Sequence, residues 1–379
     1  MPETDSVIET VGIAGGGQLA QMMLPAAADL GLKVVVLDPD PNCSASGSAD
    51  VVVGGFDSVE ALHALAARCD VVTFEIEKIS IAGLKELEDA GVCVRPSATV
   101  LEIIQDKLRQ KEFLREHGIP TSHFLACSFP GEPALALPCV WKARRDGYDG
   151  RGVAVLRTAA DVQGLPPGDA MLEELVDIEI ELATLIARAA DGELVHYPVA
   201  EIVMDADAHV MDTVIVPAAV GQALQATCTE LARQVAEALD YVGILALEFF
   251  VTRSGQVQVN EISPRPHNSG HYTIEACATS QFEQHLRAVA ERGLGSSELR
   301  RAALTFNVLG ASGANGRPRY VGFDEYADDE GTHVHCYDKP EVRPGRKMAH
   351  VTVLGDSREA VLSRAAEIKP GIRVEAAND

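Results

Sequence analysis

Short apolar runs alternate with amphipathic stretches through the first hundred residues of the chain. The apolar runs predict strands at 11–14, 33–37, 50–53, 71–74 and 92–94. Apolar residues at helical spacing predict helices over 18–30 and 59–68, in the intervals between strands. Strands separated by short helices are typical of a parallel, doubly wound sheet, and we expect one at the N-terminus.

The pattern changes after Pro96, where a charged stretch predicts a helix over 97–117. The short apolar runs that follow predict strands at 123–127, 139–143, 153–156 and 171–176. A polar, glycine-rich loop over 144–152 interrupts this group. The longer runs at 178–188 and 193–203 predict an antiparallel pair, with Asp191 and Gly192 in the turn.

A long helix over 220–239, two strands and a helix over 281–291 complete the middle of the chain. The last eighty residues contain mostly short apolar runs, which predict strands at 304–309, 333–337 and 350–354 and one helix near 358–368. They indicate a small β-rich part at the C-terminus. The fold class predicted for the whole chain is therefore α/β followed by α+β.

The composition is that of an ordinary globular protein, with 47% hydrophobic and 23% charged residues, but the net charge is −24. This charge argues against a nucleic-acid binder, because neutralising phosphates takes clustered Lys and Arg. The eight cysteines include no CxxC pair, which argues against a disulfide framework or a thiolate zinc site. No uncharged apolar run reaches about 18 residues, and no signal peptide is evident, so we expect a cytoplasmic protein without a membrane span.

A glycine-rich turn follows the first predicted strand. The segment Gly15-Gly16-Gly17-Gln18-Leu19-Ala20 fits the pattern G-x-G-x-x-A, and Asp38 ends the second strand. This is the dinucleotide fingerprint in its expected context, and alone it would favour an NAD-dependent oxidoreductase. Any tight turn from a strand into a helix needs similar residues, so the rest of the chain must decide.

Two glutamates in consecutive strands give the strongest chemical signal. Glu248 lies in an apolar run at 245–251, Glu261 lies in the next run at 256–262, and Ser254-Gly255 joins the two runs. If that dipeptide is a two-residue hairpin turn, Glu248 lies directly opposite Glu261. Like charges placed so closely need a shared proton or a divalent cation, and hard oxygen ligands favour Mg²⁺. The alternative is a pair of solvated surface glutamates, which the apolar neighbours disfavour.

Three loops carry the remaining candidate chemistry. The segment 263–271 follows Glu261 directly and concentrates Arg, His, Asn and Ser donors, which indicates an anion or substrate site. Lys142 precedes the glycine-rich loop, which either covers a nucleotide as a lid or is a solvated hairpin. The segment 337–347 gathers four cations in an acidic chain and indicates a phosphate site, with a solvated basic turn as the alternative. His333 and His335 alternate on a strand without an evident third ligand, so we expect them to be structural.

These segments together resemble the ATP-grasp superfamily and, within it, the N5-carboxyaminoimidazole ribonucleotide synthetase family. The resemblance spans almost the whole chain and includes Arg-Pro-His-Asn-Ser-Gly-His at 265–271 and Arg-Pro-Gly-Arg-Lys at 343–347. It implies a Rossmann-like domain without NAD over 1–97, an ATP-grasp domain over 98–297 with a lid near 122–175, and a C-terminal domain over 298–379. The implied reaction is ATP- and bicarbonate-dependent carboxylation of aminoimidazole ribonucleotide through carboxyphosphate.

The resemblance also implies site residues. Residues implied around the reacting amine are Asp149, Arg265, His267, Asn268 and Ser269. Residues implied to bind ATP are Lys107, Lys142, Gly147, Tyr148, Asp149, Gly150, Arg151, Gly152, Val153, Glu173, Glu174, Leu175, Val176, Glu181, Asn260 and Glu261. Residues implied to bind the ribonucleotide are Gln18, Glu75, Lys339 and Arg346, with Glu77 as a rival of Glu75. Glu248 and Glu261 fall on the positions of the family's Mg²⁺ ligands, and two ions are expected.

The expected partners are small molecules, without nucleic acid or membrane, and the resemblance implies a homodimer. Three alternatives stay open at this point. A sister ATP-grasp ligase of purine biosynthesis would activate formate, and an NAD-dependent oxidoreductase would use the glycine-rich turn. A non-catalytic nucleotide-binding module is the third alternative, although the carboxylate pair speaks against it.

Overall fold

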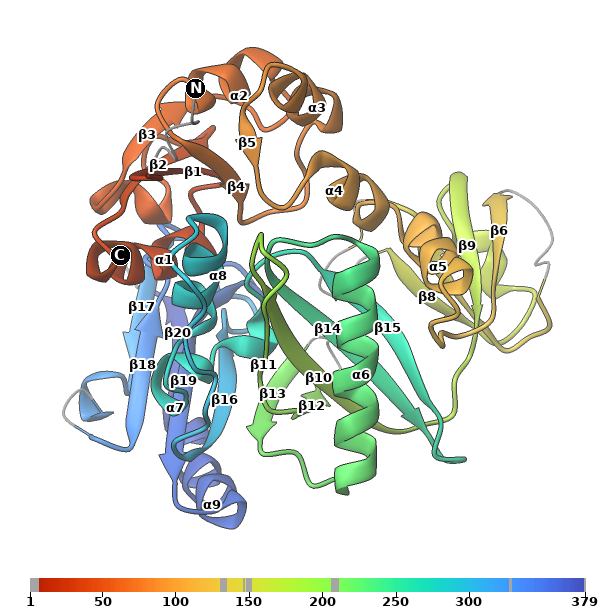
Figure 1. Cartoon of the computed structure of the whole chain (residues 1–379). Helices are drawn as coiled ribbons and strands as arrows, with labels where there is room; N and C mark the ends of the chain where they lie inside the picture. The colour runs from red at the N-terminus through yellow and green to blue at the C-terminus, as the bar shows by residue number, and fades with distance from the viewer. Residues whose placement is uncertain are drawn as a thin grey trace.

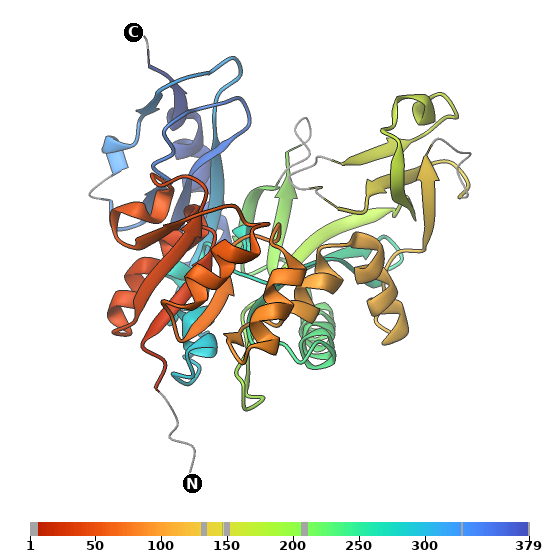
Figure 2. The same ribbon diagram turned by 90° about the horizontal axis from the view of Figure 1, so that it is seen from above.

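The computed structural model describes residues 7–129, 135–145, 147, 152–205, 211–326 and 329–377. Its elements form an N-terminal parallel sheet, a small four-stranded sheet and one large, mainly antiparallel sheet (Figure 1). Figure 2 shows the small sheet standing apart from the body of the molecule, on the far side of the large sheet from the chain's C-terminal part. Within the described ranges, no helix combines the length and the apolar character that crossing a membrane would take.

The N-terminal sheet has the order β3-β2-β1-β4-β5, and its strands are parallel, as the sequence predicts. Its strands are β1 (Thr10–Ala14), β2 (Lys33–Asp38), β3 (Asp50–Val53), β4 (Val71–Phe74) and β5 (Cys93–Val94). The helices that accompany it are α1 (Gln18–Asp29), α2 (Val59–Ala66) and α3 (Ile81–Asp89). The sequence reading missed α3, whose first turn is capped by the Ser80 side chain.

The predicted helix over 97–117 is two helices, α4 (Ala98–Ile104) and α5 (Lys107–Glu116). The break lies at Asp106, whose side chain accepts hydrogen bonds from the amides of Leu108 (3.1 Å) and Arg109 (3.4 Å) and so caps a new helix. The helices lead to the small sheet, which has the order β6-β9-β7-β8. Its strands are β6 (Phe124–Phe129), β7 (Cys139–Ala143), β8 (Val153–Leu156) and β9 (Gly168–Glu174).

The large sheet runs β15-β14-β10-β12-β13-β16-β19-β18, with β11 paired to β10. Its strands are β10 (Ile178–Arg188), β11 (Leu194–His196), β12 (Ala200–Met204), β13 (Met211–Val216), β14 (Gly243–Thr252), β15 (Val257–Ser263), β16 (Ala302–Leu309), β18 (Thr332–Cys336) and β19 (Lys347–Gly355). The strands of the C-terminal part thus continue the sheet of the middle part, through the pairing of β13 with β16. Pro198 lies between β11 and β12, where the sequence predicts one strand, and β13 was not predicted.

The remaining elements are α6 (Gln222–Ala238), α7 (Thr273–Ala276), α8 (Gln281–Val289), α9 (Arg358–Ile368) and the two-stranded pair β17 (Pro318–Val321) and β20 (Arg373–Ala376). Helix α6 packs on one face of the large sheet, where it covers Leu182, Leu247 and Val259 in a shared core (Figure 1). Side chains alternate between the faces of a strand, so the residues between these core positions point to the opposite face. That opposite face carries the site.

Candidate active site

The two glutamates predicted to face each other do so. Glu248 on β14 pairs with Glu261 on β15 in the antiparallel register of the two strands. Near the turn, however, Val251 pairs with Val257, which is one residue out of step with the predicted two-residue hairpin. A β-bulge at Asn260 adds one residue to β15 and corrects the offset. The predicted pairing is therefore right, although the predicted turn is wrong.

The two carboxylates lie in different electrostatic surroundings. The Lys107 ammonium forms an ion pair with Oε1 of Glu261. Burial raises the pKa of Glu261, but Lys107, with Lys142 and Lys111, outweighs it and the pKa is lowered. Burial, followed by the charges of Glu261 and Glu181, raises the pKa of Glu248 to about 8. Among the described residues, Glu248 makes no hydrogen bond, and its Oε1 lies 3.8 Å from Nε2 of His267. Among the described residues, Glu261 thus has a cation in direct contact, whereas the charges of Lys107 and Lys347 only partly offset the rise at Glu248.

A second group of charges lies beside this pair, at the junction with the small sheet. Glu173 on β9 is 3% exposed and forms ion pairs with Lys111, at 2.7 Å, and with Lys142. The two ammonium groups outweigh burial and lower the pKa of Glu173 to about 2. Lys142 also donates to Oδ1 of Asn260 at 3.3 Å, which links the cluster to the bulge. Lys142, Lys107, Asn260 and Glu261 line one small cavity, so these four predicted ATP residues are brought together.

Lys111 is a residue of this cluster that the sequence reading missed. Its ammonium is buried, which lowers its pKa to about 8, and it donates to hydroxyl groups of Thr121 (2.7 Å) and Ser122 (3.1 Å). A signal was present, because Lys107 and Lys111 are spaced i, i+4 and must share one face of a helix. A buried lysine on the helix face that carries Lys107, which the resemblance implies to bind ATP, is a candidate for the same site.

The loop after β15 folds back against the carboxylates. His267 Nδ1 lies 2.9 Å from the Ser269 hydroxyl, and burial together with nearby cations lowers the pKa of His267 well below its usual value. His267 is therefore neutral at pH 7. Arg265 forms an ion pair at 2.9 Å with Glu77, and Asn268 donates to the sulfur of Met211 at 3.4 Å.

The backbone amides at the glycine-rich turn donate hydrogen bonds to a carboxylate of the protein itself. Glu75, 5% exposed, accepts hydrogen bonds from the amides of Gly17 (2.8 Å), Leu19 (3.0 Å) and Ala20 (3.3 Å) at the start of α1. A Cβ at Gly17 would lie 2.5 Å from Oε1 of Glu75, which explains the glycine there. These amides are the donors that a dinucleotide phosphate would need, so the geometry speaks against an NAD site.

The structure reverses the order of preference between Glu75 and Glu77 as the carboxylate that faces the ribonucleotide. The sequence favours Glu75 as the carboxylate that faces the ribonucleotide, but its oxygens are turned to the backbone of α1. The carboxylate of Glu77 is 28% exposed and lies against Arg265 of the candidate site. Because both oxygens of Glu75 already accept backbone hydrogen bonds, the geometry favours Glu77.

The basic segment before β19 meets the N-terminal domain. Lys339 Nζ donates to Oε1 of Gln18 at 2.6 Å and to the carbonyl of Lys347 at 2.7 Å. Two predicted ribonucleotide residues, 321 positions apart in sequence, thus lie in contact. Arg346 donates to the carbonyl of Glu341 at 2.8 Å, and burial lowers the pKa of its guanidinium.

The remaining predicted ATP residues lie on the small sheet, on the chain that leaves it and on β10 of the large sheet. Glu181 lies on β10, where burial raises its pKa and Lys142 opposes the rise. Leu175 and Val176 follow Glu174, the last residue of β9, and Val153 is 41% exposed on β8. Gly152 accepts through its carbonyl from the amide of Ala143 at 2.8 Å, and Gly147 lies against it. The predicted residues Tyr148, Asp149, Gly150 and Arg151 lie outside the described part of the chain.

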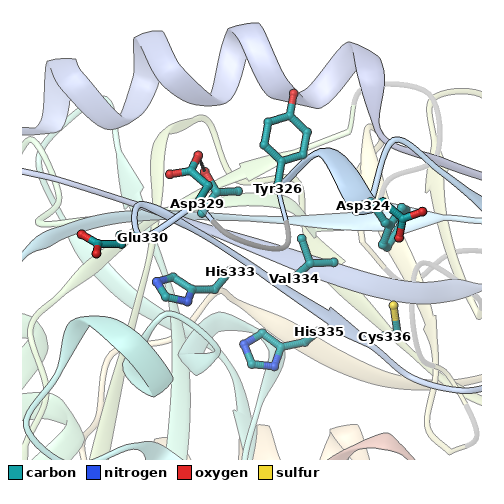
Figure 3. Close-up of a pocket in the computed structure, with 10 residues that line it drawn as sticks. Asp324, Tyr326, Asp329, Glu330, His333, Val334, His335 and Cys336 are labelled. Carbon is teal, nitrogen blue, oxygen red and sulfur yellow. Dashed lines mark hydrogen bonds between the residues drawn. The ribbon is translucent and has the colours of Figure 1, made fainter.

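His333 and His335 lie away from the carboxylate pair, on β18. Their side chains point to the same side of the strand, in an open pocket that Asp329 and Glu330 also line (Figure 3). His335 bonds to Glu275 at 2.6 Å. Within the described ranges, no group of three or more His, Cys, Asp and Glu side chains is arranged to hold a metal, at this pocket or elsewhere.

Comparisons with known proteins match all three parts of the chain. Residues 8–105 match the ribonucleotide synthetase preATP-grasp domain, and residues 112–282 match the ATP-grasp domain. Residues 303–364 match the phosphoribosylaminoimidazole carboxylase C-terminal domain. The N5-carboxyaminoimidazole ribonucleotide synthase of Synechococcus elongatus is 39% identical over 363 residues, which are 92% of this chain and 90% of that protein.

Solved structures are similar over the same span. The crystal structure of N5-carboxyaminoimidazole ribonucleotide synthetase from Thermotoga maritima has a TM-score of 0.90 and 41% identity, and the match covers 97% of this chain and 100% of that one. An Aspergillus clavatus N5-carboxyaminoimidazole synthase, solved in complex with ADP and 5-aminoimidazole ribonucleotide, has a TM-score of 0.86 and 30% identity. That match covers 96% of this chain and 98% of the other.

Proposed function

Because this chain belongs to the family of N5-carboxyaminoimidazole ribonucleotide synthases, we propose that Glu248 and Glu261 hold the Mg²⁺ of MgATP during its reaction. The chain is an ATP-grasp ligase that carboxylates the exocyclic amine of 5-aminoimidazole ribonucleotide to N5-carboxyaminoimidazole ribonucleotide. The roles of its individual residues are the proposal. The observation that carries it is the facing carboxylate pair, in which Glu248 makes no hydrogen bond to a described residue and keeps a raised pKa.

The donor set fits magnesium. Two carboxylates and the amide oxygen of Asn260 are hard oxygen ligands, and Mg²⁺ commonly takes one or two protein carboxylates together with phosphate oxygens and water. A site completed by ATP needs no cluster of three acidic side chains, which agrees with the lack of such a cluster in the described residues. When bound, the ion would neutralise charge on the β- and γ-phosphates. The raised pKa of Glu248 is what a metal-free carboxylate would show at such a site.

The phosphate end of ATP is assigned to cations around this pair. Lys107 and Lys142 line the cavity beside Glu261 and would bind phosphate oxygens, while the buried pair of Lys111 and Glu173 holds Lys142 in place. Phosphoryl transfer requires mainly positioning and charge neutralisation from the protein. Bicarbonate oxygen attacks the γ-phosphorus, the bond to the bridging oxygen breaks, and ADP leaves as carboxyphosphate forms.

The loop after β15 is assigned to the second half of the reaction. The amine attacks the carboxyl carbon, phosphate leaves, and the nitrogen loses one proton. Arg265 would stabilise the developing oxyanion, and His267 is neutral and can accept the proton. Asp149, outside the described residues, is the other candidate base. Ser269 orients the His267 ring, and Asn268 lies next to it on the same loop.

The ribonucleotide is assigned to the contact between the N-terminal and C-terminal parts. Lys339 and Arg346 would bind its 5′-phosphate, because they bring positive charge to one edge of an acidic protein. Gln18 and Glu77 complete this end of the site from the N-terminal domain. A second Mg²⁺ and a homodimer, which the family resemblance implies, remain parts of this proposal.

The test is phosphate release from MgATP with and without aminoimidazole ribonucleotide, in the wild type and in Glu261→Gln. We expect the ribonucleotide to stimulate release in the wild type, with bicarbonate and not with formate. Glu261→Gln should lose nearly all release, because the glutamine keeps the shape of the side chain and loses its charge. Normal release in this variant would overturn the metal assignment, and stimulation by formate would favour the sister ligase.

A further inference from the structure

Strand β15 lies at the edge of the large sheet, so the backbone groups on its outer side have no neighbouring strand of that sheet to pair with. In a regular strand, alternate residues turn both backbone groups outward, so outward residues are two positions apart. In β15 they are three apart. Val259 donates outward to the carbonyl of Pro120 at 2.8 Å, and the next residue with both groups turned outward is Ile262. The bulge at Asn260 produces this spacing.

Helix α5 is complementary to that spacing. Gln110 accepts from the amide of Ile262 at 3.0 Å through Oε1 and donates to its carbonyl at 3.3 Å through Nε2. Lys111, the next residue of the helix and one turn on from Lys107, donates to the carbonyl of Val259 at 3.4 Å. Lys107 on the same helix forms an ion pair with Glu261, which lies between Val259 and Ile262 in the strand. Three side chains at i, i+3 and i+4 therefore bind β15 on both sides of its bulge.

The bulge decides which way Glu261 points. Val257, Val259 and Ile262 face the core under α6, so the strand changes parity between 259 and 262. If β15 continued in the register found near its turn, Asn260 would lie opposite Glu248 and Glu261 would turn toward that core. The backbone groups of Ile262 would then point inward and Gln110 would lose both partners.

We propose that Gln110 is a positioning residue, which selects the bulged register of β15 and thereby turns Glu261 toward Glu248. This inference rests on the proposed function, since it concerns the placement of a metal carboxylate. Gln110 is 3% exposed; it also lines the small cavity beside Glu261, but both ends of its amide are turned to the backbone of Ile262. Residues that orient a metal ligand from behind typically change metal affinity or activity by about 10–100-fold when they are replaced.

The chain offers a matched control in Gln284 on α8. This glutamine is also buried and also bonds to both backbone groups of one residue, Gly295, at 2.8 Å each. Gln110→Met and Gln284→Met each remove the same two hydrogen bonds while nearly conserving volume. The readouts are the melting temperature, kcat, and the free Mg²⁺ concentration that gives half-maximal phosphate release.

We expect a loss of melting temperature in both variants, larger in Gln110→Met, because the backbone groups of Ile262 are buried and those of Gly295 are half-buried. Only Gln110→Met should raise the half-saturating Mg²⁺ and lower kcat, each by about tenfold or more. Equal kinetic constants in the two variants would overturn the proposal and leave Gln110 a purely structural role. If Gln110→Met does not fold, Gln110→Glu and Gln284→Glu replace the pair under the same criterion.

The proposed function fails separately. If Glu261→Gln keeps normal phosphate release, the metal assignment is wrong whatever Gln110 does. If Glu261→Gln is inactive and Gln110→Met has the wild-type response to Mg²⁺, only the positioning inference is wrong.

Discussion

Burial raises the pKa of both Glu75 and Glu248, although 23% of the Glu248 side chain stays exposed, and the chain treats the two carboxylates in opposite ways. Glu75 receives three backbone amides from the first turn of α1. Glu248 faces a second carboxylate, and the described residues offer it no hydrogen bond. A buried carboxylate with its own donors belongs to the fold, whereas one that lacks them indicates a ligand that supplies the charge.

The largest expected difference between the two is catalytic. Glu248→Gln should lower kcat for phosphate release by roughly 10³-fold, because the metal's charge stabilisation of the transition state is worth several kcal/mol. Glu75→Gln should instead lower the free energy of unfolding by about 1–3 kcal/mol, since the amide group cannot accept from all three backbone donors. Steady-state phosphate release and thermal unfolding measure the two effects.

The comparison would fail if Glu248→Gln did not impair activity or if Glu75→Gln impaired activity and not stability. A stable, fully active Glu248→Gln would mean that the pair is a proton-sharing structural contact. An inactive Glu75→Gln with an unchanged melting temperature would mean that Glu75 reaches the ribonucleotide, as the sequence first suggested.

The hairpin shows how far sequence reasoning reached and why. Counting from the Ser254-Gly255 turn placed Glu248 opposite Glu261 correctly, but two departures cancel in that count. The turn shifts the strands by one residue, and the bulge at Asn260 shifts them back. Neither departure has a local signal, because the donors that stabilise the bulge come from α5, about 150 residues earlier in the chain. With the bulge in place, Asn260 and Glu261 line the same small cavity.

The parallel N-terminal sheet follows directly from the alternation of apolar runs and helices, and its predicted strands are found. The group that the amides of its glycine-rich turn bind does not follow from the sequence, because the motif fits a phosphate and a protein carboxylate equally well. Glu75 comes from the end of β4, and only the fold shows that it reaches the turn. Lys111 and Gln110 were missed for a related reason, since helical spacing shows a shared face and not what that face covers.

The next largest effect concerns a charge cluster that is already balanced. Lys111→Met should lower the free energy of unfolding by about 3 kcal/mol, because it leaves the buried Glu173 with one cation fewer. Lys107→Met should cost about 1 kcal/mol at most, since its partner Glu261 is 42% exposed, yet it should impair phosphate release. Denaturant unfolding and activity separate the two lysines. Equal losses of stability would contradict the distinction between the balanced cluster and the ligand-binding pair.

The smallest effect tests the uncompensated charge of Glu248 through pH. Its pKa is raised to about 8, so the folded, metal-free protein keeps this proton until the pH rises through that value. Metal binding requires the carboxylate and must release the proton, so Mg²⁺ affinity should increase as the pH rises. With a pKa of about 8, the ionised fraction is roughly 0.1 at pH 7 and 0.5 at pH 8, and the half-saturating Mg²⁺ should therefore fall about fivefold.

Glu75→Gln should show the same pH dependence as the wild type, because Glu75 is satisfied by amides and faces no metal. A half-saturating Mg²⁺ that stays constant between pH 7 and 8 would mean that Glu248 is already ionised, and the contrast between the two glutamates would then rest on geometry alone.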